Sequence, residues 1–205
     1  MIPTESSVGG YRPRRRNWKP ADVFRGVHRG SVTGVSQKTL DEFEPILWND
    51  LTSEYDSHLL NRRVLDNPAK FSDEFVSFLE PWLADETNHY LGQRQIYSIF
   101  FGESVESIEA RTKARVSDFS GIEPFLEDEF KLCLLLAYDE IVSTYAYHRD
   151  IPFYASLGAE PFNEWIVRIK RDEATHIQQC DAAHRAQAHG PRERNEKCAA
   201  QDRER

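Results

Sequence analysis

Two segments of the chain carry the same five-residue pattern, Asp-Glu-x-x-His, and the pattern combines side chains that bind metal ions. It occupies residues 85–89 and again residues 172–176. In each copy the glutamate and the histidine are three residues apart, so on a helix both side chains leave the same face. Carboxylate oxygens and imidazole nitrogens suit iron or manganese better than a soft metal that prefers thiolates. The doubled pattern therefore predicts a metal site with these candidate ligands: Glu86, His89, Glu173 and His176.

The elements that must position these side chains are predicted to be helices, because apolar residues recur at helical spacing and few stretches alternate at period two. Four long helices are expected: one carrying the apolar residues from Leu40 to Val64 and stopped at Asn67-Pro68, and three at about residues 72–102, 122–148 and 162–188. Pro81 predicts a kink or restart in the second helix. Residues 103–121 are expected to form a long polar connection, and residues 150–161, with two prolines and a glycine, a loop. The sequence thus indicates an all-α fold, a four-helix bundle with a long connection between helices two and three.

Each Asp-Glu-x-x-His helix is predicted to have a partner helix with a glutamate at the same height. In a helical hairpin, residues equally far from the turn face each other. Glu54 and Glu86 are equidistant from position 70, and Glu140 and Glu173 are equidistant from the 156–157 bond. Burying four glutamates and two histidines is costly unless cations neutralise them. Two divalent ions would balance the four carboxylates.

This arrangement resembles the ferritin-like di-iron carboxylate proteins, in which two helices each supply a glutamate and two others each supply Glu-x-x-His. The resemblance covers roughly residues 37–188. It implies two iron ions (or manganese), with O2 as co-substrate, and Glu86 and Glu173 as bridging carboxylates. The ligands that it implies are Glu54, Glu86, His89, Glu140, Glu173 and His176.

Within that family, the doubled pattern looks like the bacterial multicomponent monooxygenase hydroxylases and, more loosely, the acyl-carrier-protein desaturases. The resemblance implies that Asp85 and Asp172 hold the ligand histidines, and that Thr144, one turn after Glu140, places a hydroxyl near the oxygen-binding face. The function implied is a non-haem di-iron oxidase or oxygenase. It would hydroxylate, desaturate or N-oxygenate a small organic or carrier-bound substrate. No flavin, iron–sulfur or haem signature is seen, so an external reductase or ferredoxin is expected.

Two other readings stay open at this point. One is a rubrerythrin-like or ferritin-like protein that scavenges peroxide or handles iron. Ferritins usually lack the second histidine, and the three cysteines (Cys133, Cys180 and Cys198) do not form a rubredoxin module. The other is a metal-free helical interaction module with solvated acids. Tight iron binding would exclude the second reading, and a requirement for an organic substrate would exclude the first.

Composition sets the remaining expectations. The 205 residues carry a net charge of -8, which makes nucleic-acid binding an unlikely role because phosphate contacts need a basic surface. We expect a flexible basic arm at residues 1–36, the di-iron bundle at 37–188 and a disordered charged tail at 189–205. No apolar run is long enough for a membrane span or a secretory signal, so a cytoplasmic location is expected. The resemblance also allows a homodimer.

Overall fold

The computed structural model describes residues 17–188, and the regular secondary structure of this part of the chain is all helical, without strands. Four helices are long: α2 (Gln37–Leu65), α3 (Asp73–Phe101), α5 (Glu129–Ser156) and α6 (Glu160–Ala188). Two are short: α1 (Pro20–Val23) and α4 (Val105–Ala114). Three 3-10 turns complete the described chain: η1 (Arg29–Ser31), η2 (Pro68–Lys70) and η3 (Glu123–Phe125). The all-α prediction is confirmed.

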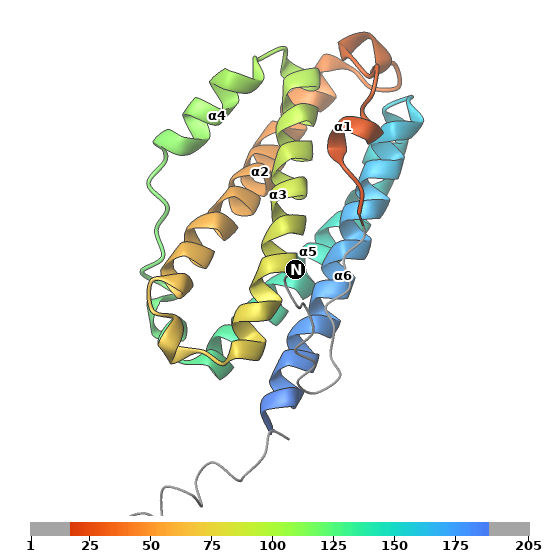
Figure 1. The fold of residues 1–205 in the computed structure, drawn as a ribbon. Coiled ribbons are helices and arrows are strands. Elements are labelled where there is room, and N and C mark those ends of the chain that lie inside the picture. The colour runs from red at the N-terminus through yellow and green to blue at the C-terminus, as the bar shows by residue number, and fades with distance from the viewer. Residues whose placement is uncertain (1–16, 189–205) are drawn as a thin grey trace, which may run out of the picture.

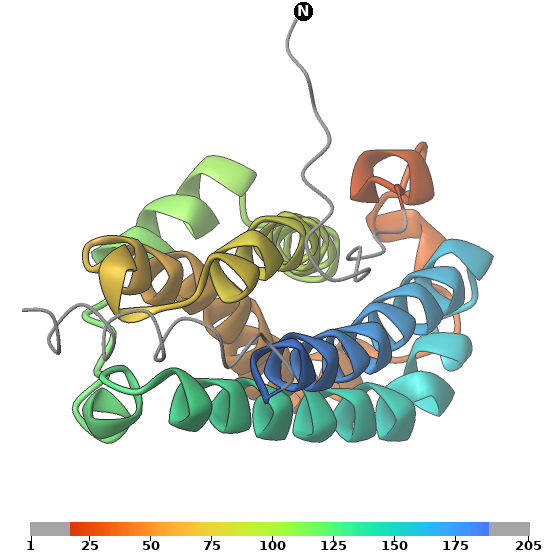
Figure 2. The ribbon, with the colours of Figure 1, turned by 60° about the horizontal axis from the view of Figure 1, so that its bottom comes forward.

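The long helices form two hairpins that pack against each other (Figure 1). α2 lies along α3, α5 lies along α6, and the hairpins meet where α3 packs on α6. α4 contacts α3, and α1 lies against α3 and α6. Figure 2 shows α5 along one edge of the molecule, with α6 on its inner side. No helix of the described chain is both long and apolar enough to cross a membrane.

Local sequence signals set the ends of these helices. The Ser36, Ser72 and Asp128 side chains accept hydrogen bonds from the backbone N–H three residues later, which caps α2, α3 and α5. Gly102 ends α3 in the left-handed conformation, with φ 71°. The buried Glu129 side chain accepts hydrogen bonds from the backbone and hydroxyl of Ser72, so the starts of α3 and α5 are tied together.

The apolar core is divided into two clusters. One cluster takes Leu40–Leu51 from α2, Tyr90–Phe100 from α3, Tyr147–Tyr154 from α5 and Phe162–Ile169 from α6. The other takes Val64, Phe75–Trp82, Leu132–Leu136 and Cys180 from the same four helices. On every long helix the predicted ligands fall between the two apolar segments. Each long helix therefore has a polar segment between two apolar ones, and the four polar segments meet in one buried layer.

The predicted loop at residues 150–161 is wrong. α5 continues to Ser156 with Pro152 inside it, α6 starts at Glu160, and only residues 157–159 connect them. Gly158 supplies the left-handed backbone of this tight turn, with φ 94°. The start of the third helix is also corrected, from residue 122 to residue 129, because Pro124 lies in η3. The α3 helix runs through Pro81 without ending there.

The predicted flexible arm at residues 1–36 is wrong for its described part, residues 17–36. Trp18, Phe24 and Val32 are buried and belong to the first apolar cluster. The glycines, prolines and basic residues of this segment suggested that it was unpacked, although these three apolar side chains bury it against the bundle. Residues 1–16 and the predicted tail at 189–205 lie outside the described chain.

Candidate metal centre

All six predicted ligands lie in the polar layer between the two apolar clusters. Each is at least nine-tenths buried. They come from all four long helices: Glu54 from α2, Glu86 and His89 from α3, Glu140 from α5, and Glu173 and His176 from α6. Glu54 and Glu140 thus lie in the layer predicted from their distances to the hairpin turns.

The ligand atoms form two overlapping groups, and the members of each group lie within 4.8 Å of one another. The first group is Glu54, Glu86, His89 and Glu173, and the second is Glu86, Glu140, Glu173 and His176. Glu86 and Glu173 belong to both. Each group offers oxygen and imidazole donors, so the buried side chains could hold a metal ion.

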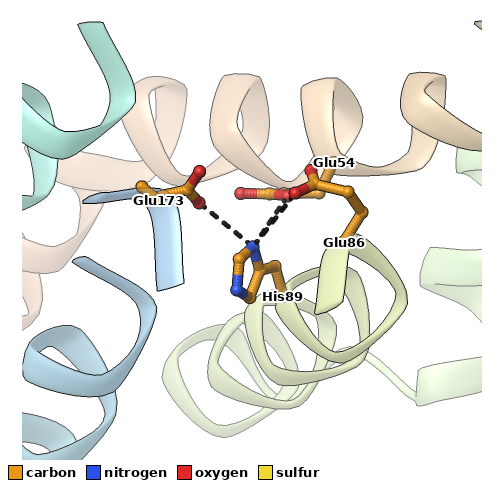
Figure 3. Close-up of side chains that lie close together, drawn as sticks. All are labelled: Glu54, Glu86, His89 and Glu173. Carbon is orange, nitrogen blue, oxygen red and sulfur yellow. Dashed lines mark ion pairs between the residues drawn. The ribbon is translucent and has the colours of Figure 1, made fainter. Parts of the chain in front are cut away.

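The first group is centred on His89 (Figure 3). Its Nδ1 atom lies 3.0 Å from Glu173 Oε1, 3.4 Å from Glu54 Oε2 and 3.8 Å from Glu86 Oε1. These three carboxylates come from three different helices and converge on one nitrogen. Their mutual repulsion when ionised would be relieved by protons or by a cation among them.

The second group repeats this arrangement around His176. Its Nδ1 atom lies 3.0 Å from Glu140 Oε2, 3.3 Å from Glu86 Oε1 and 3.6 Å from Glu173 Oε2. The ring centroids of His89 and His176 are 6.0 Å apart. The two halves of the site are thus alike, and the two shared glutamates lie between them.

The two aspartates of the sequence pattern contact the histidines crosswise. His89 Nε2 lies 3.6 Å from Asp172 Oδ2, and His176 Nε2 lies 3.5 Å from Asp85 Oδ2. Each aspartate therefore reaches the histidine of the opposite helix rather than that of its own pattern. The sequence predicted contacts between these aspartates and the two histidines but not this crossed pairing.

Three aromatic residues outside the predicted ligand set donate hydrogen bonds to the acids of the site. Trp82 Nε1 donates to Glu140 Oε1 (2.7 Å), and the Tyr147 hydroxyl donates to Glu54. Trp18 Nε1 donates to Asp172 Oδ2 (2.7 Å). Trp82 lies one helical turn before Glu86, a spacing that could have revealed it. No pattern in the sequence connects Trp18 to a residue 154 positions away.

The protein's own groups leave several buried atoms of the layer without hydrogen-bond partners in the described chain. These atoms are Glu54 Oε2, Glu86 Oε1, Glu173 Oε1 and both ring nitrogens of His89. Buried polar atoms are usually paired, and carboxylate oxygens are costly to bury alone. The three carboxylate oxygens all lie within 3.8 Å of His89 Nδ1, where a cation could also contact them.

The charges of the layer shift the pKa values of its members strongly. Burial, followed by repulsion from Glu54, Glu173 and Glu140, raises the pKa of Glu86 well above its usual range. Burial and the nearby Glu140 raise the pKa of Glu173 to about 8. Burial would also raise the pKa of Glu140, but His176 and the hydrogen bonds that Glu140 accepts lower it to about 2.

For the two histidines, the effect of nearby charges on the pKa outweighs the effect of burial. Burial alone would lower the pKa of His89 and His176, but the surrounding carboxylates raise both well above the usual value. Without a metal, the layer therefore holds protons on its histidines and on some of its glutamates. Divalent cations would displace these protons, which is the usual competition at a carboxylate and imidazole site.

A cavity of about 380 Å3 lies between α2 and α5 and reaches the layer. All four glutamates line it, and its walls include Leu60, Leu135 and Val142. Phe119 and Ile122, from the long connection between α4 and α5, line another part. Asp50, in the same wall, has a pKa raised to about 7 by burial and by Glu54. The cavity gives a small molecule access to the carboxylates.

Thr144 is near the predicted ligands in the sequence but does not line the cavity that reaches them. It is half-buried one turn after Glu140, and its Oγ1 atom has no hydrogen-bond partner in the described chain. Its predicted role near bound oxygen stays a prediction.

Comparisons of this chain with family models, with curated proteins and with solved structures find no match. The case for its function therefore rests on the geometry of the buried layer.

Proposed function

We propose that this protein is a non-haem di-iron oxidase or oxygenase built on a ferritin-like four-helix bundle. The observation that carries the proposal is the pair of ligand groups that share Glu86 and Glu173. A single metal site would need only one group of four. Two groups that share two carboxylates are the arrangement expected for two ions bridged by those carboxylates.

The donor set fits a pair of divalent iron ions. Two such ions carry four positive charges, which equal the charges of four ionised glutamates. Oxygen and imidazole ligands suit iron or manganese, and neither described cysteine, Cys133 or Cys180, belongs to the ligand groups. When bound, a reduced iron pair supplies the activation of O2 that no amino-acid side chain can provide.

The residues around the ligands would fix their orientation. Asp172 and Asp85, at the Nε2 atoms of the two histidines, would hold the imidazole rings with Nδ1 turned towards the carboxylates. Trp82 and Tyr147 would leave Glu140 and Glu54 one oxygen each for a metal, because they already bond the other oxygen. Thr144 is proposed to donate or accept a proton near the site through its unpartnered hydroxyl.

The cavity between α2 and α5 is the proposed substrate site. Its volume of about 380 Å3 suits a small organic molecule or one end of a carrier-bound chain. The cavity is mixed in character: Leu60, Leu135 and Val142 would pack against the carbon atoms of a substrate, and Asp50 and Asp139 add an acidic part. Electrons would come from an external reductase or ferredoxin. Hydroxylation, desaturation and N-oxygenation are all consistent with this pocket.

The decisive test is metal loading of the purified protein. Anaerobic addition of Fe(II) should give two irons per chain by elemental analysis and a coupled pair by Mössbauer spectroscopy. Glu140→Ala and His176→Ala should each lose at least one iron, with helical content unchanged by circular dichroism. The matched controls are Glu80→Ala and His148→Ala, which change exposed residues on α3 and α5. Two irons retained in both ligand variants would refute the assignment.

Oxygen exposure then separates the alternatives. An oxygenase should consume O2 with an external electron donor and transfer its oxidising power to an organic molecule. Rapid peroxide reduction without an organic substrate, or many irons per chain, would instead favour a rubrerythrin-like or ferritin-like role. The acidic wall at Asp50 is the observation that keeps iron handling as the second candidate, since it could pass cations to the layer.

A further inference from the structure

The outer face of α5 is unusually apolar for a helix at the edge of the molecule. Ten large hydrophobic residues of the described chain are exposed, and six of them belong to α5. Five of these form what we call the outer stripe: Phe130, Leu134, Tyr138, Ile141 and Tyr145. At 100° per residue they fall within about 80° of the helix circumference. Figure 2 shows that α6 lies along the inner side of α5.

The opposite side of α5 already serves the core. Leu132 and Leu136 pack in the second apolar cluster, and Glu140 and Tyr147 face the metal centre. A surface helix normally needs one apolar face, and a helix that is apolar on two faces is normally buried on both. The outer stripe therefore indicates a contact beyond the single chain.

We propose that the outer stripe joins two copies of this chain in an antiparallel, two-fold symmetric dimer with its axis at Tyr138. The spacing of the stripe is self-complementary about this residue. Leu134 lies four residues before Tyr138 and Ile141 three after, so each would face the other across the axis. Phe130 lies eight before and Tyr145 seven after, which forms a second matched pair. In a two-fold interface such reciprocal pairing is required.

Charges at the ends of the stripe support the same alignment. Glu127 lies eleven residues before Tyr138, and Arg149 lies eleven after. Both side chains are exposed, and Glu127 lies just before the start of α5. Within the chain, Glu127 also pairs with Lys70 and Arg149 with Asp150. An antiparallel pair would bring Glu127 of one copy to Arg149 of the other at each end. A parallel pair would place like charges together, which is unfavourable.

The exposed area also suits a second copy. Tyr138 and Tyr145 are 68% and 71% exposed, and the other three members are about half exposed. With apolar side chains of about 200 Å2 each, the outer stripe presents roughly 600 Å2. A stable dimer buries about 800 Å2 per partner, and the flanking polar and charged residues would supply the rest. Interfaces with electron-transfer partners bury less than about 1,200 Å2 in total, and a dimer that buries the stripe together with its flanking residues would exceed this.

The test is the mass in solution, measured by light scattering and sedimentation on the full chain. The wild-type protein should have twice the 23.8 kDa chain mass at micromolar concentration. Tyr138→Lys places two like charges at the axis and should weaken the dimer at least about 100-fold. Ile46→Lys, at a residue of α2 that is 41% exposed, is the matched control and should stay dimeric. A monomeric wild type, or a Tyr138→Lys variant that dimerises normally, would overturn the proposal.

Cross-linking tests the orientation without relying on that variant. Cys133 and Cys180 are buried, so a Cys198→Ser background leaves introduced thiols as the reactive ones. Phe130→Cys chains mixed with Tyr145→Cys chains and oxidised with diamide should give the mixed disulfide dimer. Phe130→Cys alone should give little. Efficient cross-linking of Phe130→Cys with itself, or capture of a different protein in place of a second copy, would contradict the antiparallel dimer.

Discussion

Asp85 lies 3.5 Å from the Nε2 atom of His176, a residue of the other hairpin, and not beside the histidine of its own pattern. Asp172 and His89 repeat this crossed relationship at 3.6 Å. As a result, an aspartate of each of the helices α3 and α6 contacts a predicted ligand histidine of the other. A change in the packing of these two helices would disturb both halves of the site together.

The first prediction concerns this crossed pair. Asp85→Asn should weaken metal binding by about 10-fold to 100-fold, because the imidazole of His176 loses the carboxylate that orients it. The effect should nearly vanish in a His176→Ala background and persist in a His89→Ala background. Titration with Mn(II) or anaerobic Fe(II) measures both. Equal losses in the two backgrounds would show that Asp85 acts on its own pattern instead. Glu80→Gln serves as the control on the same helix.

The second prediction concerns the metal-free protein and pH. Glu173 titrates near 4.5 when unfolded and at about 8 when folded, so between these values the folded state holds more protons. His89 and His176 act in the same direction, since their stabilisation is present below 6.5 and is lost as pH rises through their raised pKa values. The free energy of unfolding should therefore fall from pH 5 to pH 8. The lowered pKa of Glu140, about 2, leaves its contribution constant in this range.

Thermal unfolding of chelator-treated protein across this pH range tests that expectation. Glu173→Gln should unfold at a more uniform temperature, because the group that must give up its proton is gone. Saturating Mn(II) should reverse the slope, since protons then compete with the metal. A chelator-treated wild type that is more stable at pH 8 than at pH 5 would contradict the assigned pKa shifts.

The third prediction concerns Gly92, one turn beyond His89 on α3. A Cβ atom there would lie 2.0 Å from the Trp165 ring, so the close approach of α3 to α6 depends on glycine. Gly92→Ala should destabilise the fold by about 1–3 kcal/mol through overpacking. Because α3 and α6 carry the crossed pairs, metal affinity should fall as well. Urea unfolding and metal titration measure the two effects. Gly121→Ala, where a Cβ atom meets nothing within 4 Å, should change neither.

Helical periodicity was enough to predict the four long helices. Together with the turns, it also predicted that the candidate ligands lie at the same level along the helices. The doubled pattern fixes Glu86, His89, Glu173 and His176 within their own helices, and the hairpin turns fix Glu54 and Glu140 opposite them. The prolines were the least reliable guide to where the helices end. Pro152 lies inside α5 although it suggested a loop, because the tight turn at Gly158 and the packing of α5 on α6 favour a longer helix.

The sequence by itself determined which residues share a helix face and which faces are apolar, because those relations follow from 3.6 residues per turn. Only the tertiary structure decided that Asp85 contacts His176, that Trp18 bonds Asp172, and that the outer stripe of α5 stays exposed. These relations depend on how helices rotate and cross and on where a distant segment docks. Many weak contacts set that packing jointly, and no local spacing records it.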